Sequence, residues 1–114
     1  MKQVLFLFAM ATALVFGSNY TTKEASRHIG EKATVCGMVS GGYYATRSTG
    51  QPTFINLDGR YPNQNFTIFI LGKNRHKFSS PERSYNGRTV CVTGVIGMHK
   101  GTPQIKVTSK SQIK

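Results

Sequence analysis

The sequence predicts an all-β domain built as a small five-stranded barrel, preceded by a short helix. Two observations lead to this fold class. Five segments rich in β-branched and aromatic residues either alternate apolar with polar positions or form short apolar runs. Clusters of Gly, Pro, Ser and Asn separate these segments, as turns do. With 114 residues the chain has room for one domain.

The first 17 residues have the parts of a secretory signal peptide. Lys2 gives a positive start, residues 4–16 form a short apolar run, and Gly17 with Ser18 offers a cleavage position. The run is short for a membrane-spanning helix, so no transmembrane segment is expected after cleavage. A retained N-terminal anchor is the alternative. The expected location is therefore periplasmic or secreted.

Residues 18–30 are expected to form an N-terminal segment, and residues 31–114 the barrel. In the segment, Thr22 is expected to cap a short helix over residues 23–28 that ends at Gly30. Such a helix would close one end of the barrel.

The first two strands are expected over residues 33–39 and 53–57. In the first, alternation places Val35, Gly37 and Val39 on one face and Thr34, Cys36 and Met38 on the other. Gly41-Gly42 allows the bend or bulge by which a small barrel curls its first strand. Residues 47–52 are polar and rich in turn formers, so they form a loop.

The remaining strands are expected over residues 65–71, 88–98 and 103–108. The third strand is apolar on both faces, so its pattern leaves the inward face undecided. Residues 72–86, which connect strands three and four, are mostly polar or charged and include Ser79-Ser80-Pro81. We therefore expect a loop there with one or two helical turns. In the fourth strand, Val90 and Val92 share a face opposite Cys91.

Positive charge is concentrated in the second half of the chain. Residues 60–114 hold ten Lys and Arg against Glu82 alone, whereas residues 18–59 hold four against three acidic residues. Clustered cations bind polyanions with release of counterions, so the expected partner is nucleic acid or another polyanion rather than a small-molecule substrate. A basic protein without a specific anionic partner is the alternative.

The element order, with Val-x-Gly in the first strand and Val-x-Val-x-Gly in the fourth, resembles the OB-fold over residues 31–113. This is a five-stranded Greek-key barrel. More narrowly, the chain resembles small exported OB-fold proteins of bacteria that are described as predicted nucleic-acid binders. Residues 50–58 (Gly-Gln-Pro-Thr-Phe-Ile-Asn-Leu-Asp) are similar to the second-strand signature of the anticodon-binding barrels of class II aminoacyl-tRNA synthetases.

The synthetase resemblance implies two binding residues. The signature phenylalanine stacks on a base, which makes Phe54 the stacking candidate, and Asn56 on the same face is the hydrogen-bonding candidate. Leu57 stands where the synthetase pattern has arginine, a departure that argues against base-edge specificity of the synthetase kind.

Further candidates follow from how such barrels bind single strands. Exposed aromatic rings stack on any base, each stacked base contributing about 1–3 kcal/mol, and the tyrosine candidates are Tyr43, Tyr44 and Tyr61. A small barrel without Trp also needs aromatic residues in its core, which is the competing role for these rings. OB-folds bind between the loops joining strands one to two and four to five. The cations expected around that groove are Arg47, Arg75, Lys77, Lys100 and Lys106.

The OB-fold order also implies a disulfide. In that order strand one lies antiparallel to strand four, and alternation puts Cys36 and Cys91 on the face opposite Val35 and Val92. Export favours oxidation of such a cross-strand pair. In the cytosol both would be free thiols.

An enzyme is not expected. The four acidic residues are scattered, and the sequence shows no Ser-His-Asp or Cys-His arrangement, so we expect no catalytic residues, cofactor or metal. Met38, His76, Met98 and His99 would suit Cu(I), as in exported OB-fold copper carriers, although the tryptophan of that family is missing. The other alternative is a periplasmic barrel with a structural, protein-interaction or envelope-binding role.

Overall fold

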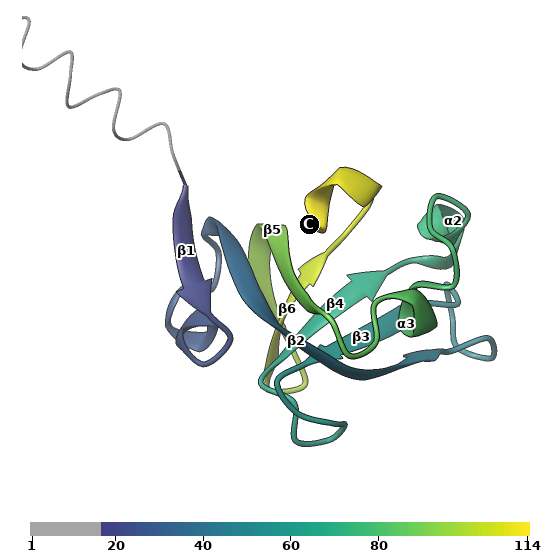
Figure 1. Ribbon diagram of the computed structural model, residues 1–114, viewed down its shortest axis with the longest axis horizontal. Coiled ribbons are helices and arrows are strands. Elements are labelled where there is room, and N and C mark those ends of the chain that lie inside the picture. The colour runs from purple at the N-terminus through teal and green to yellow at the C-terminus, as the bar shows by residue number, and fades with distance from the viewer. Residues whose placement is uncertain (1–16) are drawn as a thin grey trace, which may run out of the picture.

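The computed structural model describes residues 17–114, which are mostly β structure. The strands are β1 (Ser18–Thr21), β2 (Lys32–Tyr44), β3 (Thr53–Leu57), β4 (Phe66–Ile70), β5 (Thr89–His99) and β6 (Thr102–Lys106). The helical elements are all short: η1 (Glu24–Arg27), α2 (Gly72–Arg75), α3 (Pro81–Ser84) and η2 (Lys110–Gln112). The all-β class and the connector with helical turns are confirmed (Figure 1).

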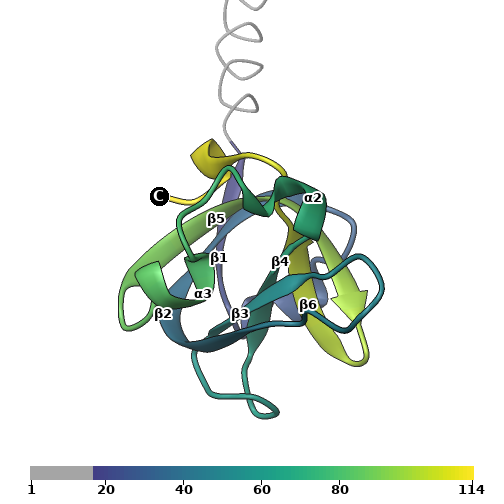
Figure 2. The ribbon, with the colours of Figure 1, turned by 90° about the vertical axis from the view of Figure 1, so that its right-hand side faces the viewer.

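Five of the six strands close into a ring. Their order is β2-β3-β4-β6-β5, and β5 pairs with β2 to complete the circle. The β4–β6 pair is parallel and the other pairs of the ring are antiparallel. Figure 2 shows these strands around a common centre. All five predicted strands are present, with ends within about two residues of the prediction except for the first, which continues to Tyr44.

The extra length of β2 is what closes the ring. Its first half, Lys32 to Met38, pairs with β5, and its second half, Val39 to Tyr44, pairs with β3. Within the second half, the register with β3 shifts between Val39 and Gly42. Gly41 there has a φ of 96°, a conformation that only glycine adopts readily. The predicted glycine bulge is confirmed, and it lets one strand serve two sides of the barrel.

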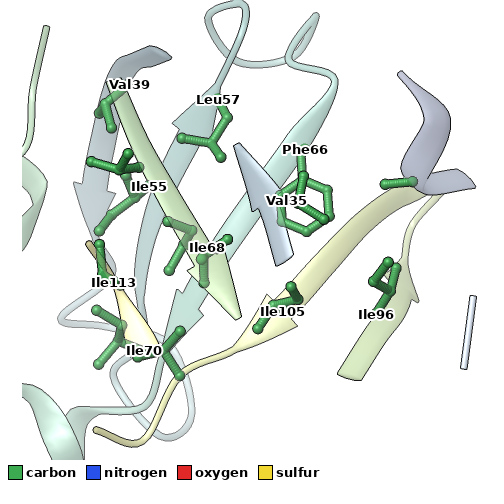
Figure 3. Packing of buried hydrophobic residues seen from close by; sticks show 14 of the residues in the cluster. Val35, Val39, Ile55, Leu57, Phe66, Ile68, Ile70, Ile96, Ile105 and Ile113 are labelled. Carbon is green, nitrogen blue, oxygen red and sulfur yellow. The ribbon is translucent and has the colours of Figure 1, made fainter. Parts of the chain in front are cut away.

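The core fills the inside of the ring. The predicted alternation in β2 and β5 is confirmed, since Val35, Val39, Val90 and Val92 are buried. For β4, whose inward face the sequence left undecided, Phe66, Ile68 and Ile70 point inward and are fully buried (Figure 3). Each such side chain contributes about 1.5–3 kcal/mol by leaving water.

The N-terminal segment differs from the prediction in two ways. β1 was not predicted; it pairs in parallel with β2, outside the ring (Figure 1). The helix is a single 3₁₀ turn, η1, with Ala25 buried in the core. Thr22 does not cap it, because its hydroxyl donates to Asp58 Oδ2 at 2.6 Å; instead, Thr21 Oγ1 accepts from the N–H of Glu24 at 3.2 Å.

The predicted disulfide between Cys36 and Cys91 is present. The two residues face each other directly in the antiparallel β2–β5 pair, with their Cα atoms 4.0 Å apart, on the outer face of the barrel. The bridge therefore joins the two strands whose pairing closes the ring.

The predicted signal peptide lies outside the described residues except for Gly17. Within residues 17–114, none of the helices has the length and apolar character that a membrane crossing requires.

Candidate nucleic-acid interface

A groove of about 720 Å³ crosses the outer face of the barrel. Its floor comes from the outward residues of β3, β4 and β6. Its walls come from the loop after β2, the loop between β3 and β4, and the β5–β6 hairpin. Of the predicted site residues, Tyr43, Phe54, Asn56 and Lys100 line it, and so does Tyr61. The two loops expected to bound the groove contribute Ser48 and Lys100.

Three aromatic rings and a lysine form a continuous row across this face, which we call the aromatic row. Strand register places Tyr43 opposite Phe54, Phe54 opposite Phe69, and Phe69 beside Lys106. Cross-strand neighbours on one face are close enough for their side chains to touch. The Phe54 and Phe69 rings meet edge to face with centroids 5.5 Å apart, and Lys106 Nζ lies 5.9 Å from the Phe69 centroid.

The aromatic row is open to a partner. Tyr43 is 64% exposed, and Phe54 is half-buried beside it. A flat ring with one exposed face can stack on a base, whereas the neighbouring lysine can reach its phosphate. Phe69 was not among the predicted site residues. It lies on β4, the strand that is apolar on both faces, where the sequence pattern does not distinguish outward from inward.

A second row, of amide and hydroxyl side chains, lies beside the aromatic row. Asn56 faces Thr67, and Thr67 faces Gln104 across the next pair of strands. All three line the groove and are largely buried. Gln64, at the groove edge, donates to Thr67 Oγ1 at 3.4 Å, and its buried Oε1 has no partner among the described residues. These groups offer hydrogen bonds to a ligand in the groove.

Arg75 and Tyr44 lie away from the groove, in a cluster at the end of the barrel beside α2 and α3. The Arg75 guanidinium donates to Glu82 Oε1 at 2.9 Å, to Glu82 Oε2 at 3.2 Å and to Thr53 Oγ1 at 2.7 Å. It also covers the Tyr44 ring, 3.7 Å from the centroid. We call Arg75, Glu82, Thr53 and Tyr44 the arginine cluster. Its contacts give Arg75 a structural role and cover one face of Tyr44.

Of the other predicted cations, some lie near the groove and some lie away from it. Lys77 Nζ donates to the carbonyl oxygen of Thr108 at 2.9 Å, a contact with the C-terminal segment rather than with the groove. Arg47 is exposed on the loop whose next residue, Ser48, lines the groove. Lys106 ends the aromatic row beside Phe69 but is not part of the lining of this groove. The expectation that Arg75 and Lys77 surround the same groove as Phe54 and Lys100 is therefore wrong in its placement of those two residues.

No carboxylate lines the groove. Each of the four acidic residues of the chain has hydrogen-bond or ion-pair partners elsewhere in the fold. Glu24 accepts from the Thr21 N–H, and Asp58 accepts from Thr22 and from the Met38 N–H. Glu31 binds Tyr20 and His28, and Glu82 binds Arg75. Lys100 in the groove lining thus has no carboxylate beside it in that lining to neutralise its charge.

The arginine cluster predicts a pH dependence of stability. Hydrogen bonds from Arg75 hold the pKa of Glu82 below its usual 4.5, although partial burial opposes the shift. A lowered pKa contributes stability that is complete above 4.5 and is lost as the pH falls through the lower, folded-state pKa. Glu82→Gln should therefore cost about 1–2 kcal/mol at pH 7, and the difference from wild type should shrink as the pH falls below about 4.5. Urea unfolding at pH 7 and pH 3 measures this; a difference independent of pH would contradict it.

The candidate copper ligands do not form one site. Met38 lies opposite Thr89 at the start of β5, whereas Met98 and His99 lie at the other end of that strand. Residues 17–114 bring no three His, Cys, Asp or Glu side chains together as a metal site would.

Comparison with known proteins finds a likeness in fold to solved structures. No protein-family model and no curated protein matches the sequence. Among solved structures, the chain is similar to the crystal structure of a putative aspartyl-tRNA synthetase from Leishmania major Friedlin, with a TM-score of 0.51 at 12% identity. The match covers 82% of this chain and 20% of the synthetase chain. The chain thus spans about a fifth of the length of the synthetase chain, and at 12% identity the likeness concerns the fold alone.

Proposed function

We propose that this protein is an exported OB-fold module that binds single-stranded nucleic acid in the groove of the aromatic row. The row itself is the observation on which the proposal rests. Tyr43, Phe54 and Phe69 provide adjacent ring surfaces for bases, and Lys106 continues the row with a cation for phosphate. Stacking with backbone contacts is how single strands are bound without base reading.

The strand arrangement supports the OB-fold part of the proposal. The ring is ordered β2-β3-β4-β6-β5, and the bent strand β2 pairs with both β3 and β5, an arrangement that fits the five-stranded barrel proposed here. The groove also lies between the loop after β2 and the β5–β6 hairpin, where OB-folds bind their ligands. The likeness to part of a putative tRNA synthetase fits this reading of the fold.

The disulfide supports the exported location. A cross-strand disulfide in a small basic barrel persists in an oxidising compartment, whereas the cytosol would keep the two thiols reduced. The bound strand would be extracellular or periplasmic DNA or RNA.

The binding test compares loss of a ring with loss of a charge. Phe54→Ala should weaken binding of labelled single-stranded DNA by about 5- to 150-fold at every salt concentration, because it removes about 1–3 kcal/mol of stacking. Lys100→Ala should chiefly reduce the slope of log affinity against log salt, by about 0.7, the value for one phosphate contact on a single strand. Fluorescence anisotropy at several salt concentrations measures both.

Two controls make the result specific. Phe54→Leu keeps apolar volume without an aromatic face, so it should bind almost as poorly as Phe54→Ala. Tyr85→Leu removes an aromatic ring of the connector that lies outside the groove, and it should bind as wild type does. Heparin that binds as tightly as DNA, with Phe54→Ala without effect, would favour a barrel for envelope polyanions instead.

A further inference from the structure

A second groove adjoins the first. It has a volume of about 500 Å³ and lies on the outer face of β5 and β6, reaching the start of β2. Gln104 lines both grooves, so the two form one continuous surface. The first groove is lined by Tyr43 and Phe54 of the aromatic row, whereas the second has no aromatic residue in its lining.

Strand register makes the second groove a continuation of the aromatic row. Lys106, which ends the row beside Phe69, lines the second groove. So does Val95, which faces Lys32 across the β2–β5 pair. Going around the barrel from Phe69, the outer surface therefore presents Lys106, then Val95, then Lys32. One lysine thus lies on each side of Val95.

Part of the lining of the second groove consists of glycine. Gly97 has no side chain, and a Cβ there would come no nearer than 3.9 Å to any atom beyond its chain neighbours, the closest being the Gln104 carbonyl oxygen. Lys32 is exposed, and Val95 is 58% exposed. Gly97 therefore leaves room for an extended chain in the groove beside Val95.

The charge around the second groove is uncompensated. No carboxylate lines it. Glu31 precedes Lys32 in sequence, but its carboxylate accepts from the Tyr20 hydroxyl at 2.7 Å and lies 2.7 Å from His28 Nδ1. Lys32 and Lys106 therefore keep their positive charge available to an anion.

We propose that the second groove binds the phosphates of the same nucleic-acid strand after it leaves the aromatic row. This rests on the proposed function and extends it. Bases stack in the first groove, and the sugar-phosphate backbone continues between Lys106 and Lys32 with its bases free. The binding site is then longer than the aromatic row, and its second half responds to charge alone.

The test varies the length of the strand. The probes are oligothymidylates of about four and about twelve nucleotides, which lie toward the two ends of the site sizes of such barrels. Wild type should bind the longer one more tightly than the added number of binding registers explains. Lys32→Ala should lower the salt slope for the longer oligonucleotide by about 0.7 and leave binding of the shorter one unchanged. Lys73→Ala, which removes an exposed lysine of α2 outside both grooves, is the matched control and should change neither.

A second pair of variants tests the path through Val95. Val95→Asp places a negative charge between the two lysines, and Val95→Asn is its neutral counterpart. Only the aspartate should weaken binding of the longer oligonucleotide, by an amount that declines with salt. Lys32→Ala that behaves as Lys73→Ala does with both lengths would overturn the inference. If the short oligonucleotide nevertheless binds Phe54→Ala more weakly than wild type, the proposed function stands without the second groove. If wild type binds neither oligonucleotide, both proposals fail.

Discussion

Replacing both bridged cysteines, Cys36→Ala with Cys91→Ala, should lower the free energy of unfolding by about 2–4 kcal/mol. The bridge spans 55 residues of sequence, so removing it returns a large loop entropy to the unfolded chain. It also joins the pair that closes the ring, so its loss weakens the contact on which the barrel depends. In a domain of this size each kcal/mol corresponds to about 4–8 °C in Tm.

The neighbouring threonine pair provides the control. Thr34 and Thr93 face each other two residues along the same strands, and their hydroxyl oxygens lie 2.7 Å apart. Replacing both with alanine removes one cross-strand side-chain contact without a covalent bond, and it should cost about 1 kcal/mol. Thermal unfolding followed by circular dichroism, under oxidising conditions, ranks the two double variants. Equal losses would mean that the bridge contributes no more than an ordinary cross-strand contact.

The second large effect is expected at Arg75. Arg75→Ala should cost about 2–4 kcal/mol, because it leaves the partly buried Glu82 carboxylate without its bidentate partner and removes the cover from the Tyr44 ring. Arg75→Lys should recover only part of this. Lysine keeps the charge but lacks the planar fork that binds a carboxylate and stacks on a ring at once.

Lys77→Ala is the matched control for Arg75, since both are cations of the same connector. Lys77 makes one exposed hydrogen bond to the Thr108 carbonyl oxygen, so its loss should cost under about 1 kcal/mol. Urea unfolding at pH 7 compares the three variants. If Arg75→Ala and Lys77→Ala destabilise equally, the arginine cluster has no special structural role.

The barrel could be predicted from the sequence because its determinants are local. Alternation in residues 33–39 and 88–98 identified inward and outward faces, and two successive glycines marked the bulge. The short polar β1 has no such alternation, and it is a strand because its backbone pairs with β2. Pairing of this kind depends on tertiary structure rather than on propensity.

The candidate site was predictable to the extent that one strand specifies it. Phe54 and Asn56 alternate with the inward Ile55, so their shared face follows from β3 alone. The role of Arg75 depends instead on Glu82, which the connector folds back toward it, and on Tyr44 from a strand remote in sequence. Composition marked Arg75 as one cation among many. Its partners became evident only when the chain was folded.

The position of the disulfide has a consequence for protease resistance. Cys36 and Cys91 enclose a covalent loop that contains β3, β4 and two walls of the groove, namely the segments 45–52 and 58–65. Both segments are largely exposed and so are natural sites of cleavage. A protein cut once in either segment remains one covalent molecule, because the disulfide still links β2 to β5. The fragments can separate only after a reductant breaks that bond. One cut in a wall of the groove therefore does not release either half of the barrel.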